Sequence, residues 1–301
     1  MAHDLGVLEA VGAGLLQGVA VVFPISDLGH GVLAGSLGDD AGADLAPANA
    51  GYLYACLRLG IGVALFVYFW RDWLRVARGL AGSVTRRSST ESERRWAWLV
   101  VLAVVPGSIG IAIVAPHARS LADHPRLAAV CLAGNGLFML FVWWWWRRSP
   151  RAGGMSGVHR APMTRGEEAE AFSVESSSLR AQQMLLLGLL PIASVVPGVS
   201  GVGLTIAAAL IWRLTHEQAA RVALLVLTPV LLTWGGRDLP DLSGTEFDGV
   251  RSAVLAACVA AVIAAYLATA LLVRYFRVAS LRPFGYYCLL AGGAALYALA
   301  R

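Results

Sequence analysis

Residues 17–30 have the sequence QGVAVVFPISDLGH, an apolar stretch that is interrupted near its centre. The interruption consists of polar or helix-disrupting residues within seven positions, namely Pro24, Ser26, Asp27, Gly29 and His30. Polar and ionisable side chains are costly inside an apolar membrane segment, so they indicate a functional site by default. A second apolar run is broken at residues 197–203, PGVSGVG, and repeats the Ser-x-x-Gly spacing of the first. We therefore expect these two breaks to form one site.

The overall composition predicts a membrane protein. Hydrophobic residues make up 57% of the 301 positions and charged residues only 14%, whereas soluble domains have about 45–50% apolar and about 25% charged residues. Arginine alone carries the formal net charge of +5, because the sequence contains no lysine. The arginines flank apolar runs, which favours contact with lipid headgroups and argues against nucleic acid as a partner. The four cysteines lie singly in apolar runs without metal or redox spacing, so we interpret them as packing residues.

Six apolar runs are long enough to cross a bilayer, which takes about 17–25 residues in a helix. They predict transmembrane helices at 52–70, 97–116, 127–146, 219–236, 250–273 and 284–300. Two further runs, 5–35 and 183–212, are too long for one span and contain the breaks at Pro24 and Pro197. The expected fold class is therefore an all-α polytopic membrane protein.

The charged segments between the apolar runs predict the topology. Arginines gather in residues 71–95 and 147–182, whereas residues 36–51 and 237–249 are acidic. Cytoplasmic loops carry the excess of arginine, so we expect the first two segments to be cytoplasmic loops and the acidic two to be external. The segment 147–182 is also rich in glycine, serine and mixed charge, which predicts a flexible cytoplasmic linker.

This topology constrains both broken runs. The arginines that flank 183–212 place its two ends on the same face, which predicts a re-entrant hairpin. If 5–35 behaves likewise from the opposite face, each half consists of one broken hairpin and three transmembrane helices. Such inverted repeats bring discontinuous helices together near the membrane midplane, where they form the site. The predicted organisation is a first repeat at 1–146, the linker at 147–182 and a second repeat at 183–301.

The sequence resembles the bacterial undecaprenyl-diphosphate phosphatases, also called bacitracin-resistance proteins. The resemblance lies in QGVAVVFPISDLGH (17–30), LRLGIGVALFVYFWRDWL (57–74), VVPGVSGVGLTIAAALI (195–211) and SLRPFGYYCLLAGGAAL (280–296). It implies a multi-pass protein of the bacterial plasma membrane with inverted repeats and two re-entrant hairpins. It also implies an enzyme that removes the terminal phosphate of a C55 prenyl diphosphate, so that the lipid carrier for cell-wall glycan is reused. The expected partners are this lipid and the bilayer; whether the protein forms a homodimer is left open.

The sequence departs from the family pattern at several positions. The family's first signature carries two glutamates four residues apart, where this chain has Gln17 and Val21. The second signature carries an arginine and a serine where this chain has Gly201 and Val202. A divalent cation would normally need two carboxylates, and only Asp27 remains in the first break. We therefore expect magnesium or calcium dependence to be weakened or relocated, and we assign no metal ligand.

Phosphoryl transfer requires a nucleophile or base and positive charge on the non-bridging oxygens. His30 is the only histidine within a broken run and is our candidate for the catalytic nucleophile or base. Asp27 precedes it by three residues and would share its face of a helix, so we expect this carboxylate to orient the imidazole. A buried His–Asp pair with a purely structural role is the alternative.

The expected phosphate-binding groups are hydroxyls and the backbone N–H groups of glycine-rich segments, which can form a nest for phosphate. They comprise Ser26, Gly29, Gly198, Ser200, Gly201 and Gly203. Arg58 is the one arginine within an otherwise apolar run and is a candidate replacement for the missing cation; the alternative is an interhelical arginine. The family resemblance favours an active phosphatase. The missing glutamates and arginine favour a non-catalytic relative that binds or translocates a polyprenyl phosphate.

Overall fold

The computed structural model describes residues 6–37, 51–85, 90–148, 179–237 and 245–301, and every regular element in these ranges is a helix. In chain order the elements are α1 (Val7–Val22), α2 (Asp27–Leu37), α4 (Gly51–Tyr68), α5 (Trp70–Thr85), α6 (Glu91–His117), η1 (Arg119–Asp123), α7 (Pro125–Arg147), α10 (Ala181–Leu189), η2 (Leu190–Val195), α11 (Gly201–Ile211), α12 (His216–Arg237), α13 (Thr245–Tyr275) and α14 (Arg282–Ala298). The all-α class is confirmed. Most of the predicted linker lies outside the described residues.

Four helices in the described ranges, α6, α7, α12 and α13, are long and apolar enough to cross a bilayer. The pair α4 and α5, which bends by 74° at its junction, would be a fifth if it counts as one broken span. These helices fit the predicted membrane protein. The 17-residue α14 is shorter, so the count of six transmembrane helices stays a prediction.

The helix α5 corrects one expectation, because its residues belong to the segment that we predicted as an arginine-rich loop. Apolar side chains recur at helical spacing, with Val76 buried and Trp73 and Leu80 half-buried against the rest of the protein. Asp72 is also buried, and the Arg221 guanidinium of α12 donates to both of its carboxylate oxygens at 3.3 Å. Hydrophobicity is confined to one stripe of α5, so a search for continuous apolar runs misses this helix.

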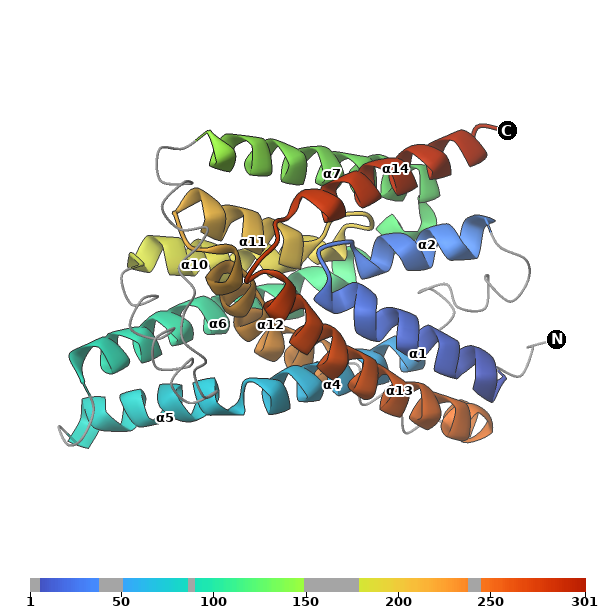
Figure 1. The fold of residues 1–301 in the computed structure, drawn as a ribbon. Coiled ribbons are helices and arrows are strands. Elements are labelled where there is room, and N and C mark those ends of the chain that lie inside the picture. The colour runs from blue at the N-terminus through green and yellow to red at the C-terminus, as the bar shows by residue number, and fades with distance from the viewer. Residues whose placement is uncertain (1–5, 38–50, 86–89, 149–178, 238–244) are drawn as a thin grey trace.

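The two broken runs form hairpins that enter the molecule from opposite sides. In Figure 1, α1 and α2 approach the centre from the right and return to the right, whereas α10 and α11 approach from the left and return to the left. A tight turn around Pro24 separates α1 from α2, and the η2 segment with the turn after it separates α10 from α11. This arrangement agrees with two re-entrant hairpins. Which side is cytoplasmic stays a prediction.

Long helices from different parts of the chain surround the hairpins. The helix α1 lies along α13, α7 along α14, and α4 against both α12 and α13. Small residues allow these contacts: a Cβ added at Gly14 of α1 would lie 2.2 Å from the Ala257 carbonyl oxygen of α13. One added at Gly136 of α7 would lie 2.7 Å from the Gly285 carbonyl oxygen of α14. Such close backbone approach is typical of helix pairs in membranes.

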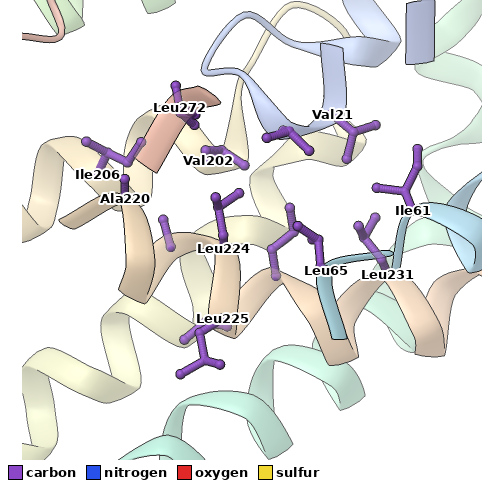
Figure 2. Close-up of a cluster of buried hydrophobic side chains, with 14 of the residues drawn as sticks. Val21, Ile61, Leu65, Val202, Ile206, Ala220, Leu224, Leu225, Leu231 and Leu272 are labelled. Carbon is purple, nitrogen blue, oxygen red and sulfur yellow. The ribbon is translucent and has the colours of Figure 1, made fainter. Parts of the chain in front are cut away.

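Part of the hydrophobic core lies where the hairpins meet α4, α12 and α13 (Figure 2). Both hairpins contribute to it, because Val21 of α1 and Val202 of α11 point towards the same cluster as Leu224 of α12. Val21 is 8% exposed and Val202 is 4% exposed. The two positions where the family resemblance leads us to expect a glutamate and a serine are therefore packed with apolar side chains.

Candidate functional site

The first break is held by Ser26, which lies between α1 and α2 with a backbone φ of +64°. A residue other than glycine rarely adopts this left-handed conformation, and it persists only where the surroundings impose it. The Ser26 hydroxyl oxygen accepts two backbone hydrogen bonds, from Gly29 N at 3.2 Å and from Gly198 N at 3.1 Å. The first of these caps the start of α2. The second comes from the other hairpin and explains what holds Ser26 in place.

The two breaks are in direct contact. A Cβ added at Gly29 would lie 2.7 Å from both Cα and N of Gly198, so the two backbones touch. Gly198 itself has φ +90°, and a Cβ there would lie 2.1 Å from the Ala128 carbonyl oxygen of α7. Glycine is required at Gly198 both for its conformation and for the lack of space. The expectation that the two hairpins meet is confirmed; that the two breaks form one functional site stays a prediction.

The second break is shaped mainly by packing. The Ser200 hydroxyl accepts a hydrogen bond from Gly203 N at 3.0 Å and caps α11. A Cβ at Gly201 would lie 2.8 Å from the Pro191 Cα, and one at Gly203 would lie 3.3 Å from the Pro24 Cβ. Gly201 is therefore enclosed by the other arm of its own hairpin and has no room for a side chain.

His30 lies in the first turn of α2 with both ring nitrogens engaged. Its Nδ1 is 2.6 Å from the Ser26 carbonyl oxygen, and its Nε2 is 2.8 Å from the Tyr287 hydroxyl of α14. A carbonyl oxygen can only accept, so Nδ1 carries the proton and Nε2 of a neutral ring presents a lone pair. The predicted role of Asp27 is therefore wrong in one respect, because backbone and tyrosine, and not this carboxylate, hold the imidazole.

Asp27 instead belongs to a group of polar side chains beside α4. It interacts electrostatically with the Arg58 guanidinium and more weakly with His30. Arg58 is 8% exposed, and its guanidinium carbon lies 3.9 Å from the ring centroid of Trp234. At this distance the interaction is a cation–π contact. Gln17 is also buried here and donates through its Nε2 to the Tyr54 hydroxyl at 3.2 Å.

Two residues of the surroundings were not predicted as part of the site. Asn135 of α7 accepts a hydrogen bond from Ser200 N at 3.4 Å through Oδ1, and its Nδ2 lies 3.8 Å from the Cys288 sulfur of α14. The Cys288 thiol in turn donates to the Pro24 carbonyl oxygen at 3.7 Å. Asn135 and Cys288 therefore link the second break, at Ser200, to the first break, at Pro24. An asparagine inside the apolar run 127–146 was a signal in the sequence that could have identified this position.

Comparison with known proteins identifies the family. The model of the bacitracin resistance protein BacA family matches residues 10–294. The chain belongs to the BacA family. Among curated relatives, the undecaprenyl-diphosphatase of Mycolicibacterium paratuberculosis is 37% identical, with 100% of this chain and 99% of the relative covered. That of Mycobacterium avium is 36% identical with the same coverage, and undecaprenyl-diphosphatase 2 of Frankia alni is 35% identical with 96% and 97% covered.

The geometry limits how this BacA-family chain could hold phosphate. Four backbone N–H groups at the breaks, those of Gly29, Gly198, Ser200 and Gly203, already have side-chain partners within the protein. The glycines and serines thus have an observed structural role. Their phosphate-binding role stays a prediction, and a phosphate that used these N–H groups would have to displace protein contacts.

A protein-built divalent metal site does not fit the residues around His30. Magnesium and calcium prefer carboxylate and carbonyl oxygens, and the first break supplies one carboxylate, Asp27, which already interacts with a guanidinium. The position of the family's second glutamate is Val21, packed in the core. Within the described ranges no group of three or more His, Cys, Asp or Glu residues could hold a metal. The expectation that magnesium or calcium dependence is weakened or relocated stays a prediction.

Proposed function

We propose that this protein is a membrane-embedded undecaprenyl-diphosphate phosphatase. It would hydrolyse the C55 prenyl diphosphate to the monophosphate and inorganic phosphate and so return the lipid carrier to cell-wall synthesis in the bacterial plasma membrane. The observation that carries the proposal is the position of His30. In a chain related over its full length to proteins of that name, this histidine lies beside the contact between two broken hairpins, with one nitrogen fixed by a backbone carbonyl.

The proposed chemistry follows from the tautomer of His30. With Nδ1–H held by the Ser26 carbonyl, Nε2 can accept a proton from a water molecule as that water attacks the terminal phosphorus. The new bond joins the water oxygen to phosphorus, and the bond from phosphorus to the bridging oxygen breaks. The prenyl monophosphate leaves with that electron pair, and the water proton resides on His30. The Ser26 carbonyl stabilises the imidazolium that forms, as the orienting group does in other histidine-dependent sites.

Charge neutralisation is assigned to Arg58. Stabilising the developing negative charge on phosphoryl oxygens is commonly the largest contribution to catalysis, and the second break supplies no cation because Gly201 replaces the family arginine. Arg58 is buried, lies over Trp234 and interacts with Asp27, three residues before His30. We propose that the incoming diphosphate takes over part of the Arg58 charge from Asp27.

The finer architecture is also a proposal. An inverted repeat of 1–146 and 183–301 is supported by the way helices pair across the halves. The helix α1 packs on α13 and α10 packs on α6, while α4 packs on α13 and α12 packs on α6. The pairs α4 with α12 and α7 with α14 would then lie on the pseudo-symmetry axis. Three transmembrane helices in each half and two hairpins that reach the midplane would complete this plan.

The alternative is a relative that binds or translocates a polyprenyl phosphate without hydrolysing it. Two observations favour this alternative: Val21 is packed in the core, and Gly201 has no room for a cationic side chain. Inverted repeats with broken helices are also a transporter plan.

Phosphate release from the C55 prenyl diphosphate by the purified full-length protein distinguishes the two functions. We expect hydrolysis by the wild type and a loss of at least about 100-fold in His30→Gln, the scale of general-base catalysis. His117→Gln is the matched control, because His117 also bonds a carbonyl four residues earlier but lies at the exposed end of α6. A wild type that binds the prenyl phosphate but releases no phosphate would establish the carrier.

A further inference from the structure

One face of α14 is fitted to the first break. Phe284 packs edge-to-face on Phe23 with ring centroids 5.5 Å apart, and Cys288 donates to the Pro24 carbonyl. Tyr287 contacts His30 between them, with its hydroxyl 2.8 Å from Nε2. Positions 284, 287 and 288 share one face of a helix. These three contacts span the whole turn from α1 into α2.

The Tyr287 and His30 rings are also nearly parallel. Their planes differ by 8° and their centroids are 5.6 Å apart. Tyr287 is 46% exposed, whereas His30 is only partly exposed, so the tyrosine lies on the outer side of the imidazole. Because Nδ1 of His30 carries the proton, the hydrogen bond at Nε2 must be donated by the Tyr287 hydroxyl. This hydroxyl therefore occupies the Nε2 lone pair that, in the proposed function, accepts the proton of the attacking water.

The backbone that carries Tyr287 is held in place independently of His30. A Cβ added at Gly285 would lie 2.8 Å from the Leu140 side chain of α7, and one added at Gly292 would lie 2.6 Å from Ala133 N of the same helix. The helix α14 is thus packed closely along α7 on both sides of Tyr287. A change at the tyrosine ring can therefore occur by side-chain rotation without movement of the helix.

We propose that Tyr287 is a positioning residue that covers Nε2 of His30 and holds the imidazole ring in its reactive orientation until substrate arrives. The inference deepens the proposed phosphatase function and rests on it for the identity of the substrate. On binding, the tyrosine hydroxyl gives up Nε2, and the attacking water takes its place. The tyrosine ring remains beside the imidazole and limits its rotation.

The first test needs no turnover. Diethyl pyrocarbonate acylates the nitrogen of a neutral imidazole that carries the lone pair, which in His30 is Nε2. In purified full-length protein we expect His30 to be modified about fivefold faster in Tyr287→Phe than in the wild type, the factor for one hydrogen bond of ordinary strength. Tyr286→Phe is the matched control, because Tyr286 is the neighbouring exposed tyrosine of α14. Peptide mass spectrometry measures the rate, with His117 as the internal reference.

The second test uses the C55 prenyl diphosphate. Tyr287→Phe should lower kcat about fivefold with KM within about twofold of the wild type, because the ring orientation is affected and the binding groups are not. A purely structural role would lower the Tm of the variant and leave His30 reactivity unchanged.

The outcomes separate this inference from the proposed function. Equal His30 modification in the wild type, Tyr286→Phe and Tyr287→Phe overturns the role of Tyr287 even if the protein is an active phosphatase. Faster His30 modification in Tyr287→Phe, but not in Tyr286→Phe, supports that role. If the wild type also releases no phosphate, the proposed phosphatase function is wrong but the role of Tyr287 remains supported. If Tyr287→Phe does not fold, Tyr287→His, which keeps an aromatic ring and a hydrogen-bond donor, must restore both folding and slow modification; fast modification in that variant overturns the inference.

Discussion

The two breaks share a spacing but differ in what fixes them. The first contains ionisable groups, Asp27 and His30, and a serine held at a positive φ by a bond from the other hairpin. The second contains no ionisable group; its residues are fixed by contact with neighbouring backbone, as Gly201 is by Pro191. A chain can thus repeat an architecture without repeating its chemistry. Here the second hairpin serves as the support against which the first is shaped.

The largest expected effect on stability comes from placing a cationic side chain in the second break. Gly201→Arg restores the family arginine, but a Cβ at this position already lies 2.8 Å from the Pro191 Cα. We expect the variant to be destabilised by about 3 kcal/mol or more, the upper range for overpacking, and not to gain activity. Thermal unfolding of purified protein measures this, with Gly134→Ala, which meets nothing within 4 Å, as the control. A stable, more active variant would show that the second break is a phosphate site.

Replacing the capping serine should destabilise the protein more at the first break than at the second. Ser200→Ala removes one accepted bond at the start of α11, which should cost about 1 kcal/mol of stability. Ser26→Ala removes two accepted bonds, one of them between the hairpins, and leaves the positive φ in place. We expect a loss of about 2 kcal/mol or more. Denaturant unfolding of both variants in one detergent provides the comparison, and equal losses would contradict it.

A smaller effect is expected when the charge interaction of Asp27 with Arg58 is compared with that of Asp27 with His30. In a double-mutant cycle for stability, Asp27→Asn and Arg58→Gln should be coupled by about 1 kcal/mol, since their charges interact in a buried site. The cycle of Asp27→Asn with His30→Gln is the matched comparison and should give about half that value or less. Stronger coupling to His30 would restore the carboxylate as the group that orients the imidazole.

Metal removal is expected to have the smallest effect. With one carboxylate in the first break, EDTA should lower phosphate release by less than about threefold. Gln17→Glu places a second carboxylate beside Tyr54 in the same polar group, and the chelator effect should then increase to about tenfold or more. A large EDTA effect on the wild type would mean that magnesium or calcium is held by residues other than those of the first break.

Much of this organisation could be predicted from the sequence. The apolar runs predicted α7 and α12 to within a few residues, since 127–146 corresponds to Pro125–Arg147 and 219–236 to His216–Arg237. The helices α6 and α13 begin earlier than their predicted runs, and α5 was missed. The breaks at Pro24 and Pro197 predicted the hairpins, because proline and clustered polar groups are incompatible with a plain membrane helix. The meeting of the hairpins followed from the same cost of isolated polar groups in hydrocarbon.

The partners within the site could not be predicted in this way. Spacing placed Asp27 near His30, but the imidazole Nδ1 found the carbonyl four residues earlier, a competitor that every helical histidine has nearby. Its other partner, Tyr287, lies 257 residues further along the chain and is placed by the packing of α14 on α7. The Asp72–Arg221 pair was hidden for a similar reason, because its two helices meet only in the folded protein.

The packing of α1 on α13 has a consequence for how the protein is made. Gly14 and Gly18 of α1 are fitted to the backbone of Ala257 and Ala261 in α13, which leave the ribosome roughly 10–50 s later at ordinary synthesis rates. Until α13 has been made, the first hairpin, with its carboxylate and imidazole, lacks the helix surface on which α1 packs. The final packing of the first hairpin on α13 therefore follows the synthesis of most of the chain.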